Sequence, residues 1–353
     1  MRLFGWLVLF LSVGVSAVLW RLSGWVTAPS QPASQSASQL HVAFDVSPDG
    51  RKVVFTDVNS DLYLLDLQTR KVARLTTTEA WEAAPAFSPD GKSLAYSVTA
   101  PGTEFAALWI RTLDGRVIRQ LTRGVAEADY APSFFAGGES LVFARSARIP
   151  LDTGGSTHSA DIYVIGRDGR GLRRITREGY FTVNSPRVDP DGKSVIYSAE
   201  KLDLHRMTAK TDAELILKAD LTGTKLPKVV GPVPPAGYRG AAWVSEPRLA
   251  RDGKTLVFIS DRNHAYYYDL FLMNSDGTGT RCLGVTRLSS SNRLPVLLPG
   301  GKGVLFLGDE THHNQPIFGL YRVDLDGTNL RLLADSVLFT QPLQWQDRSS
   351  IVN

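Results

Sequence analysis

Short apolar runs separated by turn residues repeat along most of this chain. Residues 53–55, 62–65, 162–165 and 270–273 are apolar at consecutive positions, which is typical of strands whose two faces are both buried. After about residue 30, no window keeps an apolar period of 3.6 residues. We therefore expect residues from about 40 onward to form an all-β structure.

The tripeptide Pro-Asp-Gly separates many of these runs. Three copies are centred on Asp49, Asp90 and Asp191, and degenerate copies are centred on Gly137, Asp252 and Gly300. The copies stand roughly 40 to 60 residues apart, in or above the period of four-stranded propeller blades. Six copies predict six repeats.

The second repeat, residues 85–122, shows the unit most fully. Pro-Asp-Gly follows a short β-rich segment, a second turn falls at Asp114-Gly115, and the unit ends in Arg-Gln-Leu-Thr. Asp-Gly supplies the positive φ that tight hairpins require, and Pro fixes φ at the first corner. The sequence therefore predicts a six-bladed β-propeller of four-stranded blades. Residues 340–345 resemble a seventh innermost strand that clasps the ring.

The N-terminal segment differs from the rest of the chain. Residues 3–20 carry no charge and are flanked by Arg2 and Arg21, a length at the boundary between a signal-peptide core and a membrane-spanning helix. Residues 29–39 contain only Pro, Ser, Gln and Ala, as expected of a flexible spacer. We assign 1–27 to a hydrophobic helix that is a signal anchor or signal peptide, 28–39 to a flexible, disordered linker, and 40–353 to the propeller. The propeller should be exported to the periplasmic or extracellular face, anchored in the cytoplasmic membrane.

Charge and cysteine content narrow the function classes. A formal net charge of +4 over 353 residues, without a dense Lys/Arg block, gives no indication of nucleic-acid binding. Cys282 is the single cysteine, so the chain has no internal disulfide, and we expect this thiol to be buried and inert.

A family resemblance is carried by residues 258–262, Phe-Ile-Ser-Asp-Arg, and 269–279, which include Met-Asn-Ser-Asp-Gly. These elements resemble the blade signature of TolB-like propellers, and the resemblance covers about residues 42–333. In TolB an α/β domain precedes the propeller, whereas an anchor and a spacer stand there in this chain. The repeat occurs in envelope proteins, peptidase propellers and sugar-acting enzymes. The resemblance is therefore specific for the repeat type and not for a function. Together with the N-terminal segment, it leads us to expect a cell-envelope interaction module whose partner is an envelope protein or a cell-wall component.

Topology indicates which face should bind. The turns between strands one and two and between strands three and four are short, so both sets of longer connections meet on the opposite face, where binding residues usually reside. We call the two sides the short-turn face and the long-loop face. Candidate binding residues on the long-loop face, mixed aromatic and polar, are Trp81, Glu82, Asp129, Tyr130, Tyr180, Asn184, Tyr238, Arg239, Trp243, Asn292 and Arg293. Packing of these side chains between blades is the alternative.

An enzymatic function is the second hypothesis. The loops joining strands two and three hold five of the six histidines: His158, His205, His264, His312 and His313. Imidazoles can bind a metal, so a metal-assisted lyase acting on an extracellular glycan is the alternative function. The chain has no Gly-x-Ser-x-Gly, Cys-x-x-Cys or His-Glu-x-x-His motif, which would indicate other chemistry. We therefore predict no catalytic residue, metal or cofactor.

Overall fold

The structure is a computed structural model. It describes residues 42–150, 156–200, 202–203, 208–209, 214–232, 244–263, 268–285, 292–312 and 315–344. The predicted anchor and linker lie outside these residues. Within the described part of the chain, no helix has both the length and the apolar character needed to cross a membrane.

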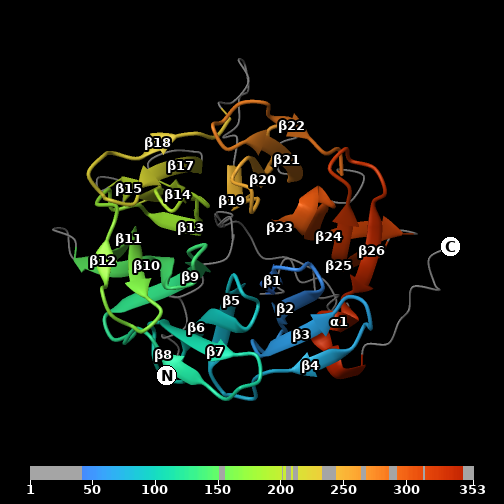
Figure 1. Ribbon diagram of the computed structural model, residues 1–353, viewed down its shortest axis with the longest axis horizontal. Coiled ribbons are helices and arrows are strands. Elements are labelled where there is room, and N and C mark those ends of the chain that lie inside the picture. The colour runs from blue at the N-terminus through green and yellow to red at the C-terminus, as the bar shows by residue number, and fades with distance from the viewer. Residues whose placement is uncertain are drawn as a thin grey trace, which may run out of the picture.

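Six antiparallel four-stranded sheets surround a common axis, which confirms the predicted six-bladed β-propeller (Figure 1). Blade one contains β1 (Phe44–Val46), β2 (Lys52–Thr56), β3 (Leu62–Asp66) and β4 (Val72–Arg74). Blade two contains β5 (Trp81–Phe87), β6 (Ser93–Thr99), β7 (Ala107–Thr112) and β8 (Ile118–Gln120). Blade three contains β9 (Glu127–Phe134), β10 (Ser140–Pro150), β11 (Ser156–Gly166) and β12 (Arg173–Arg174).

Blade four contains β13 (Thr182–Val188), β14 (Ser194–Glu200), β17 (Leu215–Asp220) and β18 (Lys228–Val229), and a small hairpin of β15 (Leu202–Asp203) and β16 (Thr208–Ala209) is inserted after β14. Blade five contains β19 (Val244–Leu249), β20 (Thr255–Ser260), β21 (Asp269–Asn274) and β22 (Arg281–Cys282). Blade six contains β23 (Arg293–Leu297), β24 (Val304–His312), β25 (Gln315–Val323) and β26 (Arg331–Asp335), with the short helix η2 (Pro299–Gly301) between β23 and β24.

The Pro-Asp-Gly turns form as predicted, and they also join neighbouring blades. In the first turn, Oδ1 of Asp49 accepts bonds from the Ser47 hydroxyl at 2.6 Å and the Arg51 amide at 3.0 Å, while Gly50 has φ +72°. A β-carbon on Gly50 would lie 3.1 Å from Cδ of Pro299. Blade six therefore meets blade one at this turn, and the same Gly-on-Pro packing recurs between other neighbours.

The ring closes through a C-terminal helix, and the predicted seventh strand is wrong. Residues after blade six form α1 (Val337–Thr340) and η3 (Pro342–Gln344). Phe339 is 1% exposed within a core cluster built from blades one and six. Its ring packs edge-on against Phe55 with centroids 5.5 Å apart, and its carbonyl accepts the Val58 amide at 3.0 Å. Packing of the Phe339 side chain thus contributes to closing the ring, where we had expected a paired strand.

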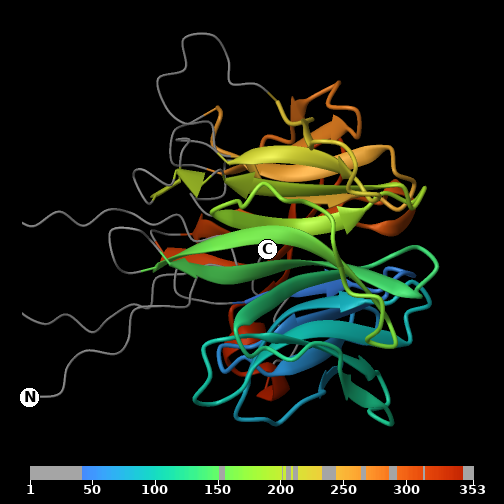
Figure 2. The ribbon, with the colours of Figure 1, turned by 90° about the vertical axis from the view of Figure 1, so that its left-hand side faces the viewer.

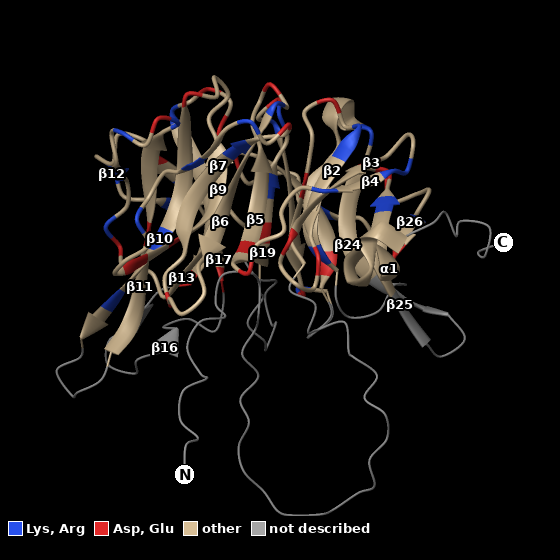
Figure 3. Cartoon of the chain, turned by 90° about the horizontal axis from the view of Figure 1, so that it is seen from below, with Lys and Arg blue, Asp and Glu red and all other residues tan. Residues whose placement is uncertain are grey.

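The two faces differ as the connectivity predicts. In every blade the strands alternate in direction, so the short turns gather at one end of the strands, as the edge view shows (Figure 3). The paired strands β10 and β11 continue past the ring on the long-loop face, and the side view shows the same extension (Figure 2).

Candidate functional site

Among the described residues of the predicted binding set, Trp81 is the exposed aromatic, with half of its surface accessible. Its exposed fraction is 50%, and Val58 in the neighbouring loop of blade one is 42% exposed. The two segments are joined by a bond of 3.2 Å from the Glu82 amide to the Ser60 carbonyl. Two large apolar side chains are therefore accessible where blades one and two meet on the long-loop face.

Glu82 and Asp129 are buried, and other side chains of the protein bind their carboxyls. Glu82 is 3% exposed and Asp129 is fully buried, and burial raises the pKa of both carboxyls. The hydroxyls of Thr76 and Thr78 donate to Glu82. Asp129 receives two bonds from the Arg145 guanidinium, at 2.6 and 2.9 Å. A partner outside the ring would not reach these carboxylates in this arrangement.

The remaining described candidates are buried or half-buried between blades. Tyr130 is 6% exposed and Tyr180 3%, and the Tyr180 hydroxyl lies 3.0 Å from that of Tyr197. Asn184 donates to Glu214 at 3.0 Å. Asn292 is fully buried and donates to the Tyr268 carbonyl at 2.8 Å. Arg293 is half-buried. The binding role of this set stays a prediction, and Trp81 is the described member with a large accessible surface.

Several predicted residues lie outside the described part of the chain: Tyr238, Arg239, Trp243, His205, His264 and His313. The side chain of His312 is not described either, whereas His158 is half-buried on β11. Among the described residues, no three His, Cys, Asp or Glu side chains are grouped so as to hold a metal ion. The histidine hypothesis therefore stays a prediction.

The central channel carries a repeated backbone feature that sequence analysis missed. In blades two to six the inner strand contains a bulge, and a non-glycine residue with positive φ precedes a proline there. These residues are Ala84, Ala131, Ser185, Glu246 and Leu294, with φ between 48° and 55°. Left-handed backbone costs such residues about 1–2 kcal/mol each, so the fold holds strained backbone around the channel. The sequence has a proline at this point of the inner strand in blades two to six, but a proline does not specify a positive φ for the residue before it.

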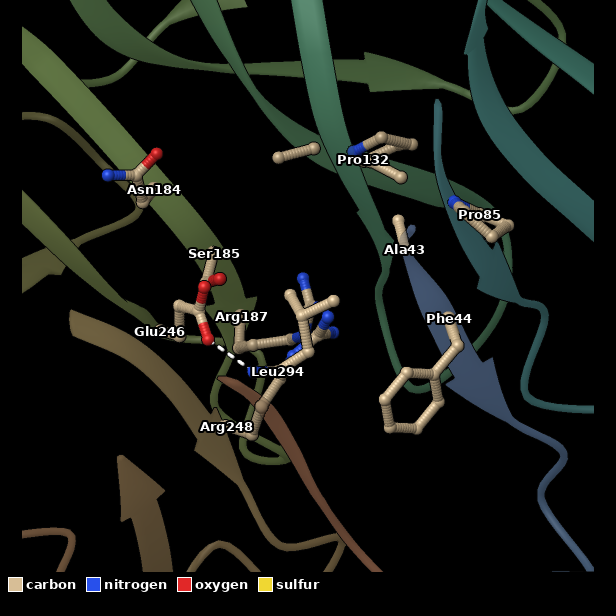
Figure 4. A pocket seen from close by; sticks show the side chains of 12 residues that line it. Ala43, Phe44, Pro85, Pro132, Asn184, Ser185, Arg187, Glu246, Arg248 and Leu294 are labelled. Carbon is tan, nitrogen blue, oxygen red and sulfur yellow. Dashed lines mark hydrogen bonds between the residues drawn. The ribbon is translucent and has the colours of Figure 1, made fainter. Parts of the chain in front are cut away.

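Two cavities follow one another along this channel. The smaller, about 40 Å³, lies at the bulges and includes Ala84, Ser185 and Glu246 in its lining. The larger, about 250 Å³, extends to turn residues of the short-turn face, including Pro89, Pro190 and Pro299. The side chains of Arg187 and Arg248 line both cavities and lie together in the middle of the smaller one (Figure 4). Sequence analysis did not single out either arginine.

The channel holds charged groups that are poorly solvated. Burial raises the pKa of Asp45, an effect opposed by the charge of Arg248. Burial in turn lowers the pKa of Arg248. Asp45 accepts the Phe87 amide at 2.9 Å, and the described residues show no ion pair between Asp45 and Arg248 within 4 Å. The channel can therefore attract a charged ligand group.

Comparisons with known proteins agree with this architecture. An uncharacterised protein, Atu1656 of Agrobacterium fabrum, is 26% identical over 160 residues, which cover 43% of this chain and 52% of that protein. The crystal structure of TolB from Acinetobacter baumannii has a TM-score of 0.56 at 20% identity, over 81% of this chain and 61% of that chain. An oligogalacturonate lyase in complex with manganese has a TM-score of 0.51 at 16% identity, over 79% and 75%.

These matches support conclusions of different strength. At such identities the two structural matches show the fold alone, and the chain spans about half of the curated relative, 52% of its length. A family model goes further, because the model of the TolB beta propeller domain matches residues 30–226, more than half of the chain. The chain therefore belongs to the TolB β-propeller domain family.

Proposed function

We propose that this chain is an interaction module of the cell envelope, exported and tethered to the cytoplasmic membrane, whose long-loop face binds an envelope protein or a cell-wall component. Membership of the TolB propeller family supports an interaction role, and one of the similar structures is itself a TolB. The uncharged run at residues 3–20 and the polar linker support export and tethering.

The observation that carries the proposal is the exposure of Trp81 beside Val58 on the long-loop face. Tryptophan is the residue type most enriched among those that dominate binding energy, and apolar neighbours help to exclude water around it. Exposed apolar side chains that adjoin one another mark interaction sites more often than isolated ones do. The turns of the short-turn face carry exposed lysines, Lys92 and Lys193, and also exposed apolar residues, among them Val117 and Leu226. A cross-linking experiment therefore has to decide between the two faces.

Site-specific cross-linking in membranes tests the face. A photoreactive amino acid replaces Trp81 in one variant of the full chain and Lys92 in another. We expect a discrete cross-linked envelope component with the probe at position 81 and none at position 92. When a Trp81→Ala chain without the photoreactive residue is expressed in the same cells, it should compete poorly for the partner. The cross-link from position 81 should therefore persist. The same product at position 92 alone would show that the wrong face has been chosen.

Fractionation tests the tether separately. The full chain should remain with membranes after carbonate extraction, whereas residues 40–353 should be soluble, because the apolar run is the proposed membrane attachment. Recovery of a soluble mature chain that starts near residue 18 or 29 would identify a cleaved signal peptide and contradict anchoring.

A further inference from the structure

One tier of the central channel is polar on one side. Each inner strand contributes one residue to this tier. That residue stands four positions before the middle residue of the Pro-Asp-Gly turn, or of its degenerate copy, that follows the strand. All six of these residues line the larger cavity: Asp45, Ala86, Ser133, Arg187, Arg248 and Val296. Blades four and five, which are neighbours, therefore supply two adjacent arginines, and blade three supplies a hydroxyl.

Arg251 adds a third guanidinium at the mouth of the same cavity. Its position corresponds to the turn residue that is Pro48, Pro89, Pro190 and Pro299 in four other blades. Among the described residues, the lining of this cavity thus contains three arginines and one acidic residue, Asp45. Its formal charge is positive on the side of blades four and five.

Arg248 has donor capacity that the described protein does not use. Its Nε is buried and has no hydrogen-bond partner in the described part of the chain. Arg187 donates through Nη1 to the carbonyl of its neighbour Pro186 at 2.8 Å. Arg248 as a whole is half-buried, and its Nε–H is the donor that is removed from water. A buried donor without a partner is costly, and folded proteins normally pair such groups. The lack of a protein partner points to a ligand.

We propose that the channel binds a singly charged carboxylate group between Arg187 and Arg248, entering from the short-turn face. The planar fork of a guanidinium matches the two oxygens of a carboxylate, and Ser133 offers a further hydroxyl on the same wall. The cavity of about 250 Å³ exceeds by several times the roughly 30 Å³ that a water molecule occupies, so a small acid fits.

Asp45 reduces the positive charge of the cavity but does not cancel it. Its carboxyl lines the same cavity as the three arginines, so the attraction of an anion by the guanidiniums exceeds its repulsion by the single carboxyl. This site is separate from the long-loop face, so the inference does not depend on the proposed partner binding there.

Titration of the purified full chain in non-ionic detergent tests the site at constant ionic strength. The probes are N-acetylglycine, which carries one carboxylate, inorganic phosphate at pH 7.5, and chloride. N-acetylglycine should raise the melting temperature with saturating concentration dependence, phosphate should act more weakly, and chloride should have no saturable effect.

Two variants give the comparison. Arg248→Gln should weaken N-acetylglycine binding about tenfold or more, the usual scale for loss of a charge-assisted hydrogen bond. Arg116→Gln removes the same charge from a turn outside the channel, where the Arg116 side chain is 86% exposed, and should leave affinity within about twofold of wild type. The melting temperature of Arg248→Gln without probe is the reference for its own titration, because loss of Arg248 also removes a charge that opposes the effect of burial on Asp45. Arg187→Gln provides a second test of affinity.

Three results would overturn the inference. The first is no saturable effect of N-acetylglycine on the wild-type chain. The second is equal binding by wild type, Arg248→Gln and Arg187→Gln. The third is tighter binding of phosphate than of N-acetylglycine, which would identify a phosphate site rather than a carboxylate site.

Discussion

At the residue scale, the Thr that ends the repeat in blades one to three has a structural role. The hydroxyls of Thr76, Thr122 and Thr176 accept the amides of Leu62, Leu108 and Ile162 at 2.8, 2.9 and 3.0 Å. Each bond joins the residues that follow an outer strand to the third strand of the same blade. The Thr therefore satisfies a buried amide that strand pairing leaves unpaired.

Thr76→Val should lower the free energy of unfolding by about 1–3 kcal/mol, because the buried Leu62 amide loses its acceptor while side-chain volume is retained. Thr76→Ser keeps the hydroxyl and should cost less than half as much. Urea unfolding of both variants measures the difference. Equal losses would show that the methyl group, rather than the hydrogen bond, matters at this position.

The buried glutamate beside the channel predicts a pH dependence of stability. Burial raises the pKa of Glu246 to about 7, against an ordinary value of 4.5. Between these values the folded state holds a proton that the unfolded state has released, so stability falls as pH rises from about 4.5 to 7. The loss from this group is up to about 3 kcal/mol.

Glu246→Gln should therefore flatten the decline of unfolding free energy between pH 5 and 7, because glutamine retains an acceptor for the Leu294 amide that Glu246 now binds. Chemical unfolding at several pH values measures the slope. Glu79→Gln, at an exposed position, is the control and should keep the wild-type slope. An unchanged slope in Glu246→Gln would place the pH dependence elsewhere.

At the element scale, the bulges of the inner strands give opposite predictions for two nearby alanines. Ala84 has φ +48°, so Ala84→Gly removes about 1–2 kcal/mol of left-handed strain and adds about 0.5–1 kcal/mol of unfolded-state entropy. The net expectation is no loss or a slight gain in stability. Ala86, two residues later, is 4% exposed and its φ is not positive, so Ala86→Gly should lose stability. Thermal unfolding of the pair measures the sign, and equal losses would argue against strain at Ala84.

The sequence predicted the elements well wherever pattern and turn chemistry agree. The apolar runs and the Asp-Gly turns specify strands and hairpins directly, so the four strands of each blade could be predicted. The bulge could not be predicted, because Ala84 followed by Pro85 does not indicate a positive φ in the way that a glycine would. Residues 340–345 were misread as a strand because their apolar residues, Leu343 and Trp345, are too few to distinguish strand from helix.

At the scale of the whole molecule, connectivity predicted which face gathers the long loops, but not which of their residues are accessible. Glu82 and Asp129 are polar, and a single sequence does not reveal that they face Thr76 and Arg145 across the blade. The channel arginines were missed for a related reason. Arg187 and Arg248 are 61 residues apart in the chain, and only ring geometry makes them neighbours.

Closure of the ring depends on Phe339, and its truncation tests how the two ends of the propeller are held together. Phe339→Ala removes a buried ring from the cluster shared by blades one and six, while the backbone bond between Val58 and residue 339 can persist. We expect a loss of about 3–5 kcal/mol, as for other buried aromatics. Leu343, in the adjoining short helix, is 62% exposed, so Leu343→Ala should cost less than about 0.5 kcal/mol. Urea unfolding compares the two. A similarly small loss for Phe339→Ala would mean that the Gly50–Pro299 contact and blade packing close the ring without the C-terminal helix.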